Sequence, residues 1–178
     1  DNSDQYYERR TGASIGISRP VRENLSLGIS GRFENVKTEN VESAGSDQYI
    51  QQDGDVAVLS FGGVLNKRDR DVDPTRGSWL RVDLEPGYSN ITNVGGAAVD
   101  QSILGTNTFF RTSMEYRHYF TDGPPLGRDL NAVRRVLALR VRYGGIAGDV
   151  PFFEQFFAGG SDTVRGYSED RFWGRQQL

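Results

Sequence analysis

The sequence places three aspartates at alternate positions, Asp69, Asp71 and Asp73. Their carboxylates could together bind a metal ion. This spacing opens the calcium loop of EF-hands, which also needs Gly at its sixth position and Glu at its twelfth. Pro74 and Leu80 occupy those two positions here. The EF-hand pattern therefore fails, and we expect a charged, solvated hairpin and no metal site.

Two further sets of residues have types that occur in catalytic sites. Asp83 and Glu85 are paired carboxylates, the groups that glycosidases use as acid and base, but they alternate with Arg81, which favours a charge network. His118 is not accompanied by the Ser or Cys residues that would make it a catalytic base. It falls on the apolar face of its predicted strand, near the strand end, which favours a position at the membrane interface. We therefore expect no catalytic residue, no cofactor and no enzyme.

The composition narrows the class of protein further. The 178 residues include no cysteine and a single histidine, which excludes disulfide scaffolds, cysteine-based zinc sites and histidine-rich metal sites. The formal net charge is −3, so the overall charge does not indicate a nucleic-acid partner. A transmembrane helix is excluded because no run of about eighteen apolar residues exists. Neither end carries a start or stop signal, and we expect a piece of a longer polypeptide.

Alternation of apolar and polar residues with a period of two dominates the sequence and indicates β-strands. The clearest case is the series Leu137, Leu139, Val141 and Tyr143, which alternates with Ala138, Arg140, Arg142 and Gly144. The pattern predicts six strands, at approximately 6–19, 24–37, 54–67, 78–90, 107–120 and 134–147. These strands exceed the five or six residues that are typical of globular proteins, and the roughly nine to eleven that a membrane-spanning strand needs.

The predicted connections alternate between short and long. The short ones are 20–23 and 68–77, the long ones are 38–53, 91–106 and the segment from 148 onward, and 121–133 is intermediate. Outer-membrane barrels have short turns on one rim and longer loops on the other. We therefore expect all the long loops on one side, which we take as extracellular.

The polar face of the predicted strands carries many charges of both signs. They are Glu8, Arg10, Arg32, Glu34, Arg81, Asp83, Glu85, Arg111, Glu115, Arg117, Arg140 and Arg142. In a soluble β-sandwich this face would meet water, whereas in a membrane barrel it would line the lumen and the apolar face would meet lipid. A narrow, dry barrel core could not hold these charges without a large desolvation cost, but a wide, wet lumen could. The strand pattern favours the membrane barrel and leaves the sandwich open.

Two motifs separate these alternatives. The first combines an aromatic pair, a Gly-Gly step and a Val-Arg-Gly-Tyr string, in residues Phe156, Phe157, Gly159, Gly160, Val164, Arg165, Gly166 and Tyr167. The second consists of Arg68, Asp69, Pro74, Thr75, Arg76 and Gly77. The first closely resembles the sixth extracellular loop, and the second the periplasmic hairpin, of the BamA/TamA/FhaC superfamily of outer-membrane insertases and translocases.

The resemblance implies an all-β fold, a transmembrane antiparallel up-and-down β-barrel in the outer membrane of a diderm bacterium. Residues 1–178 would form a partial barrel domain with about six consecutive strands and, at 148–178, the start of the sixth extracellular loop. In the family this loop folds back into the lumen, and its arginine, here Arg165, contacts an acidic residue on a later strand. Glycines 159, 160 and 166 permit backbone conformations closed to other residues and a close approach to the wall.

The resemblance also implies protein assembly without bond chemistry. The leading expectation is an insertase that folds β-barrel proteins into the outer membrane. A two-partner-secretion translocase is the alternative, less favoured because both motifs take the BamA or TamA form, and a soluble β-sandwich binding module is a remote third. The implied partners are outer-membrane lipids, unfolded outer-membrane clients, POTRA domains earlier in the same polypeptide and accessory assembly subunits; nucleic acid is not among them.

Overall fold

A computed structural model of the chain describes residues 6–40, 51–95, 101–122, 135–161, 163–167 and 172–178. The strands are β1 (Tyr6–Arg22), β2 (Leu25–Asn40), β3 (Gln51–Asn66), β4 (Gly77–Gly95), β5 (Gly105–Thr121), β6 (Val136–Gly148), β7 (Phe156–Ala158), β8 (Phe172–Gly174) and β9 (Gln176–Gln177). Two short 3₁₀ helices, η1 (Gln101–Ile103) and η2 (Phe152–Glu154), complete the described structure. Among these residues, no helix is long and apolar enough to cross a bilayer.

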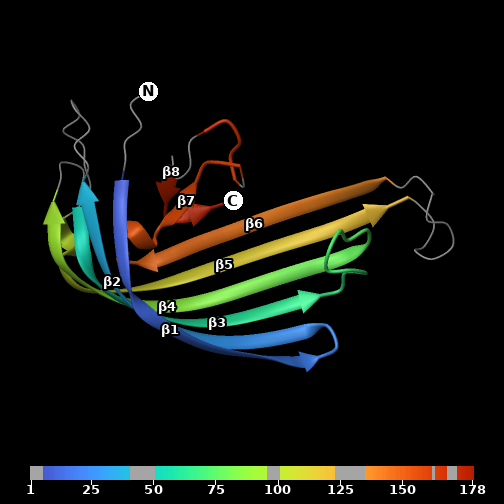
Figure 1. Cartoon of the computed structure of the whole chain (residues 1–178), viewed down its shortest axis with the longest axis horizontal. Coiled ribbons are helices and arrows are strands. Elements are labelled where there is room, and N and C mark those ends of the chain that lie inside the picture. Colours follow the sequence, from blue (N-terminus) through green and yellow to red (C-terminus); the bar gives the residue numbers. More distant parts are fainter. Residues whose placement is uncertain (1–5, 41–50, 96–100, 123–134, 162, 168–171) are drawn as a thin grey trace.

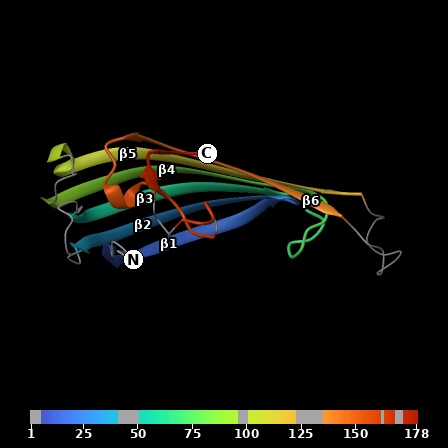
Figure 2. The same cartoon turned by 90° about the horizontal axis from the view of Figure 1, so that it is seen from above.

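The strands β1 to β6 form one antiparallel sheet in chain order, and β9 adds to the outer edge of β6. Figure 1 shows that this sheet is curved, with the described part of residues 149–178 on its concave side. The view from above in Figure 2 places the same residues in front of the sheet at one end of the strands. An antiparallel sheet in which every strand pairs with the next is the arrangement that the predicted barrel fragment requires, and the fold prediction is confirmed.

All six predicted strands are present, and most of them are longer than predicted. β1 continues to Arg22, β2 to Asn40 and β4 to Gly95. The alternation of apolar residues ends before the ladder does, because polar side chains continue the pairing at the ends. The Thr38 hydroxyl, for example, donates to the carbonyl oxygen of Gln52 at 3.1 Å and accepts from its N–H at 2.7 Å. The sixth strand was predicted to begin at 134, which lies outside the described residues, and the observed strand begins at Val136.

The connections depart from the predicted alternation of lengths. The turn at 23–24 is short, as expected, but the connection 67–76 is as long as 41–50, which was predicted to be long. Because β4 and β5 both extend, only 96–104 remains between them, whereas the connection 122–135, predicted to be intermediate, is longer. Loop length therefore does not separate the two rims. Residues 41–50, 96–100 and 123–134, on which these predictions also fell, lie outside the described part of the chain.

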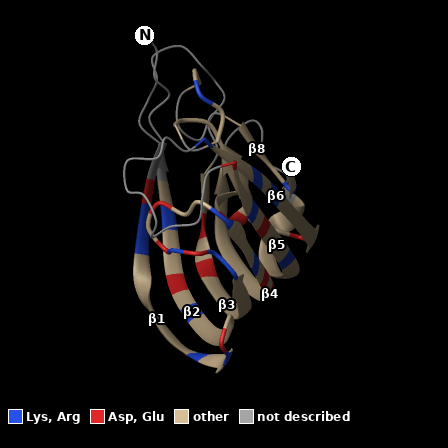
Figure 3. Ribbon diagram, turned by 90° about the vertical axis from the view of Figure 1, so that its right-hand side faces the viewer, with Lys and Arg blue, Asp and Glu red and all other residues tan. Residues whose placement is uncertain are grey.

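The two faces of the sheet differ in the predicted way. Large apolar side chains are exposed on the convex face, among them Ile15, Ile17, Leu27, Ile29, Phe33, Phe110, Leu137, Leu139 and Val141. The charged residues alternate with them, and their ion pairs with the returning segment place them on the concave side. Figure 3 marks their positions along the strands as bands of both signs. In β3 both faces carry apolar residues: Val56 and Val58 are buried on the concave face, whereas Leu59 and Phe61 are exposed on the convex face.

A small apolar core lies on the concave face where the chain returns after β6. Its buried side chains are Val36, Val56, Val58, Ile91, Ile103, Phe109, Val150 and Phe153. Two of them, Val150 and Phe153, belong to the returning segment, and each is 2% exposed. Full burial of such a side chain contributes roughly 1.5–3 kcal/mol, so these two residues hold the segment against the sheet.

Candidate functional site

The segment after β6 turns back at Gly148 onto the concave face of the sheet β1 to β6, which we call the wall. This residue has a φ of 88°, and a Cβ atom there would lie 2.4 Å from the carbonyl oxygen of Thr108, so the turn requires glycine. Asp149 N–H donates to the same Thr108 oxygen at 3.2 Å. Further on, Phe152 N–H donates to Oε1 of Gln52 on β3 at 2.6 Å. Backbone contacts therefore direct the segment across the inside of the sheet.

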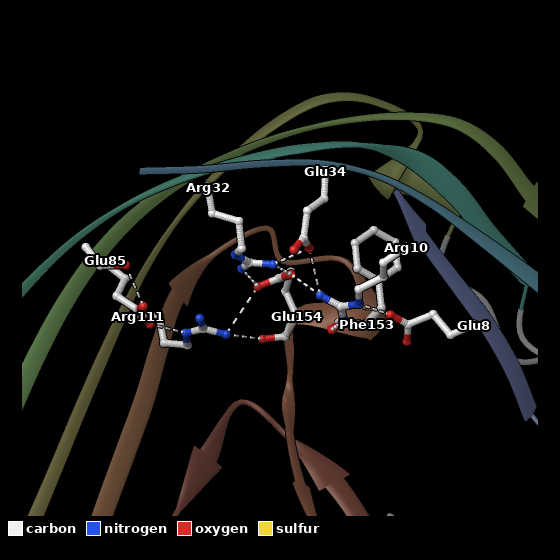
Figure 4. A network of polar contacts seen from close by, with 9 residues as sticks. Glu8, Arg10, Arg32, Glu34, Glu85, Arg111, Phe153 and Glu154 are labelled. Carbon is white, nitrogen blue, oxygen red and sulfur yellow. Dashed lines mark hydrogen bonds and ion pairs between the residues drawn. The ribbon is translucent and has the colours of Figure 1, made fainter. Parts of the chain in front are cut away.

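Glu154, at the end of η2, is the most connected side chain of this segment. Its side chain is 1% exposed. Arg32 of β2 binds both carboxylate oxygens, with Nη1–Oε1 at 3.1 Å and Nη2–Oε2 at 2.9 Å. Arg10 of β1 and Arg111 of β5 each add a contact at 3.2 Å (Figure 4). A buried carboxylate is costly to desolvate unless it is paired, and a bidentate arginine is its most specific partner. Glu154 therefore ties the returning segment to three strands of the wall.

Further carboxylates of the wall hold the three arginines in place. The ion pairs are Arg10 with Glu8, Arg10 with Glu34 at 3.2 Å, Arg32 with Glu34 at 2.6 Å, and Arg111 with Glu85 at 2.5 Å. Arg10 also donates to the carbonyl oxygen of Phe153 at 2.8 Å. We call the seven charged residues Glu8, Arg10, Arg32, Glu34, Glu85, Arg111 and Glu154 the Glu154 cluster. It contains four carboxylates and three guanidinium groups, so its formal charge is −1.

The aromatic pair of the first motif lies directly after Glu154, in β7. The ring of Phe156 packs on Gly144 of β6, where an added Cβ would lie 2.5 Å from the ring. Phe157 and Trp173 both meet Phe152 edge-on, with ring centroids 5.4 and 5.3 Å away. Phe156 therefore contacts the barrel wall, whereas Phe157 packs within the loop.

The Gly-Gly step and the Val-Arg-Gly-Tyr string close a compact loop at 159–167. Gly159, Gly160 and Gly166 have φ values of 141°, 78° and 95°, which only glycine adopts readily. Gly160 N–H donates to the carbonyl oxygen of Tyr167 at 3.1 Å, and the Thr163 hydroxyl donates to that of Gly159 at 2.6 Å. The loop is thus closed by its own hydrogen bonds, and Val164–Tyr167 are exposed.

Arg165, the motif arginine, is exposed and donates only weakly, from Nε to the carbonyl oxygen of Ser161 at 3.5 Å. No carboxylate of the described residues lies within ion-pair distance of it. Its pairing with an acidic residue on a later strand stays a prediction. In this chain, the buried charge contact between loop and wall is made by Glu154.

The second motif forms the turn between β3 and β4. Asp69 accepts from Thr75 N–H at 3.0 Å, from the Thr75 hydroxyl at 2.5 Å and from Arg76 N–H at 3.2 Å. Burial alone would raise the pKa of Asp69, but hydrogen bonds from Thr75 and from the backbones of Arg76, Thr75 and Arg70 outweigh it and lower this pKa to about 2. Gly77, with a φ of 99°, ends the turn against the Lys67 carbonyl. Asp69 therefore shapes the hairpin.

The other residues considered for chemistry fall into separate surroundings. Asp83 pairs with Arg81 at 2.6 Å, and Glu85 belongs to the Glu154 cluster, so the two carboxylates take part in different ion pairs. His118 lies on the convex face, with Nδ1 at 2.9 Å from the Tyr116 hydroxyl and its ring 4.2 Å from that of Phe120. No group of three metal-ligating side chains occurs within the described ranges.

Sequence reasoning missed Glu154 and Gly144. Glu154 stands between two phenylalanine pairs, Phe152-Phe153 and Phe156-Phe157, and an acidic residue within such an aromatic run signals a buried, paired carboxylate. Gly144 gave no signal of this kind, because glycine is frequent in the predicted strands.

Comparison with known proteins gives two findings. Residues 1–177 match the family model described as the Omp85 superfamily domain. The "Outer membrane protein assembly factor BamA" of Nitratidesulfovibrio vulgaris is 25% identical over 173 residues, an alignment that covers 93% of this chain and 19% of that protein. The chain thus spans about a fifth of the length of the relative that it matches.

Proposed function

The chain belongs to the Omp85 superfamily, and from this premise we propose that it is part of an insertase that folds β-barrel proteins into the outer membrane of a diderm bacterium. The relative described above carries the name of such an assembly factor. The soluble β-sandwich alternative is wrong, because the family match spans residues 1–177 and β1 to β6 form one curved sheet with an exposed apolar face. The proposed activity involves no bond chemistry.

The observation that carries this proposal is the attachment of the returning segment to the wall. Glu154 is bound by arginines from β1, β2 and β5, and Phe156 is seated on β6. Such contacts would hold the loop motif at one place over the lumen while other strands of the intact barrel open and close. In this proposal, residues 1–178 supply the rigid wall of the barrel and the base of the loop.

The proposed partners follow from the two faces. The apolar convex face would contact outer-membrane lipids, and unfolded outer-membrane proteins would be the clients. The hairpin at 67–76 would lie on the periplasmic rim, near POTRA domains of the same polypeptide and accessory assembly subunits. A two-partner-secretion translocase is the second candidate, and the charged concave face would also suit a pore for polypeptides. The form of both motifs and the name of the relative favour the insertase.

Complementation tests the proposal. Cells depleted of the native full-length protein would express Arg165→Ala or Arg165→Lys, and outer-membrane protein levels and surface-protease cleavage of the loop would be measured. If Arg165 is buried against a carboxylate in the intact barrel, Arg165→Ala leaves that group unpaired at a cost of about 3–5 kcal/mol. Arg165→Lys should also impair assembly, because an ammonium group cannot reproduce the planar guanidinium fork.

The matched control is Arg22→Ala, at the exposed end of β1. It should support normal assembly. Normal client levels and unchanged protease protection in both Arg165 variants would refute the assigned role of the motif. Normal client levels in cells that lack the protein altogether would refute the insertase proposal itself.

A further inference from the structure

The concave face carries a second group of charges, toward the strand ends that are joined by 67–76 and 122–135. We call Arg81, Asp83, Glu115, Arg117, Arg140 and Arg142 the Glu115 cluster. Glu115 is contacted by Arg117 at 2.5 Å, Arg140 at 2.8 Å and Arg142 at 3.4 Å, and Arg81 binds Asp83 at 2.6 Å. Along β5, Glu115 and Arg117 follow Arg111 of the Glu154 cluster by four and six residues, which is about 13 and 20 Å at roughly 3.3 Å per residue.

The Glu115 cluster has an excess of positive charge. It contains four guanidinium groups and two carboxylates, so its formal charge is +2 within the described part of the chain, whereas that of the Glu154 cluster is −1. Arg117 and Arg140 also lie directly opposite each other in the β5–β6 register. Like charges at directly opposed positions are destabilising. Glu115 contacts both arginines, and a further carboxylate would relieve the repulsion that remains.

The arginines are accessible from the concave side, with exposed side-chain fractions of 34% for Arg117, 40% for Arg140, 39% for Arg142 and 55% for Arg81. Beside them, the inner face of β1 to β3 carries only small side chains over several residues. These are Ser14, Gly16, Ser18, Ser26, Gly28, Ser30, Ser60 and Gly62. The inner face of β1 to β3 is therefore nearly flat, and the long arginine side chains of the Glu115 cluster project beside it.

The two clusters differ in the anion that they receive. The arginines of the Glu154 cluster receive a carboxylate from a separate segment of chain, namely Glu154 itself. The Glu115 cluster receives no such carboxylate from any described segment. Beside this cluster, the ring of Trp79 lies 4.9 Å from the guanidinium carbon of Arg117 and orients that group. Guanidinium groups held in this way are suited to bidentate binding of carboxylates.

We propose that the Glu115 cluster binds an acidic segment of a client polypeptide in an extended conformation. This inference rests on the proposed insertase function, which would bring unfolded chains to the hairpin end of the barrel. An extended segment has side chains that alternate between two faces, so acidic residues at every second position would all point at the arginines. The small side chains of β1 to β3 leave room for its backbone.

Peptide binding to the purified full-length protein in detergent tests this inference. The probes are a fluorescein-labelled peptide of alternating Glu and Ser and its counterpart with Gln in place of Glu, measured by fluorescence anisotropy. The Glu peptide should bind more tightly, and Arg117→Gln/Arg140→Gln should weaken its binding by about tenfold, with a marked dependence on salt. The matched control, Arg19→Gln/Arg22→Gln, removes the same charge from exposed positions of β1 and should leave binding unchanged.

Several outcomes would overturn the inference. One is equal binding of the Glu and Gln peptides, and another is unchanged binding to Arg117→Gln/Arg140→Gln. Equal competition by inorganic phosphate would indicate a general anion site. The Glu peptide could also fail to bind to the wild-type protein while Arg117→Gln/Arg140→Gln lowers the unfolding temperature. That result would indicate that other parts of the intact barrel supply carboxylates to these arginines. Client assembly into proteoliposomes, measured in parallel, separates the two proposals: its absence refutes the insertase, whereas assembly without a preference for acidic peptides refutes only this inference.

Discussion

Two turns of this chain are organised around a carboxylate, and they use it in opposite ways. In the hairpin between β3 and β4, Asp69 is exposed and accepts hydrogen bonds from residues six and seven positions later. In the returning segment, Glu154 is buried and its arginine partners lie between 43 and 144 positions away in the sequence. The first carboxylate determines a local shape, whereas the second determines where a segment lies on the wall. Substitutions should therefore affect the two regions separately.

The largest effect is expected from Glu154→Ala. This change removes the anion that three arginines share, although each keeps another carboxylate partner. It should destabilise the docked segment by about 3 kcal/mol, the low end of the usual cost of breaking a buried ion pair. Trypsin cleavage at Arg165 and Arg175, followed in the full-length protein in membranes, should become faster. Glu154→Gln keeps the shape of the side chain and some hydrogen bonds, so its effect should be smaller.

The control for this experiment is Glu23→Ala, at the exposed turn between β1 and β2. It should leave loop cleavage unchanged. If Glu154→Ala is cleaved no faster than wild type, the apolar contacts of Val150 and Phe153 alone hold the segment, and the contrast between the two carboxylates loses its basis.

A smaller effect is expected at the second point of attachment, Gly144. An alanine Cβ there would lie 2.5 Å from the Phe156 ring, so Gly144→Ala should displace β7 at a cost of roughly 1–3 kcal/mol, the usual range for overpacking. Loop cleavage is again the measurement. Gly145→Ala is a matched control, because its nearest neighbour is the Tyr143 hydroxyl at 3.3 Å, the far end of a side chain that is able to move. Equal cleavage of both variants would show that Phe156 does not position the loop.

The same contrast explains which features could be predicted from the sequence. The strands were predictable because alternation with a period of two reports which face is buried, and that signal is local. Their ends were not, because polar residues such as Thr38 extend the ladder through hydrogen bonds that leave the apolar pattern unchanged. The turn at Asp69 lies within a short motif, so its location was visible in the sequence.

The Glu154 cluster was only partly predictable. Strand parity placed Arg10, Arg32 and Arg111 on one face, and the structure confirms this. It could not identify the anion that they share, because that depends on how the sheet curves and on where the chain after β6 returns. The motif itself drew attention to Arg165, whereas the buried contact in this chain is made by the acidic residue before the motif.

In the hairpin, Asp69→Asn should have a moderate and local effect. The amide retains one acceptor oxygen but loses the charge that strengthens the bonds to Thr75 and Arg76, a loss of about 1 kcal/mol for a partly solvated, charge-assisted interaction. Hydrogen exchange of the 67–76 turn should accelerate, while trypsin cleavage of the loop after β6 should stay at the wild-type rate. Accelerated cleavage of that loop would show that the two regions are coupled.

Lowering the pH is expected to have the smallest and most selective effect on the hairpin. The pKa of Asp69 in the folded hairpin is about 2, below its ordinary value of 3.8. As the pH falls, the unfolded turn therefore binds its proton before the folded one does, so the stabilisation by this carboxylate is complete above about pH 4 and is lost as the pH falls toward 2. A nitroxide label at Val72→Cys, which is 84% exposed at the tip of the turn, should gain mobility over this interval. In Asp69→Asn the same label should already be mobile at neutral pH and should change little on acidification. An equal rise in mobility in both proteins would mean that another group controls the turn, and the local role of Asp69 would then be wrong.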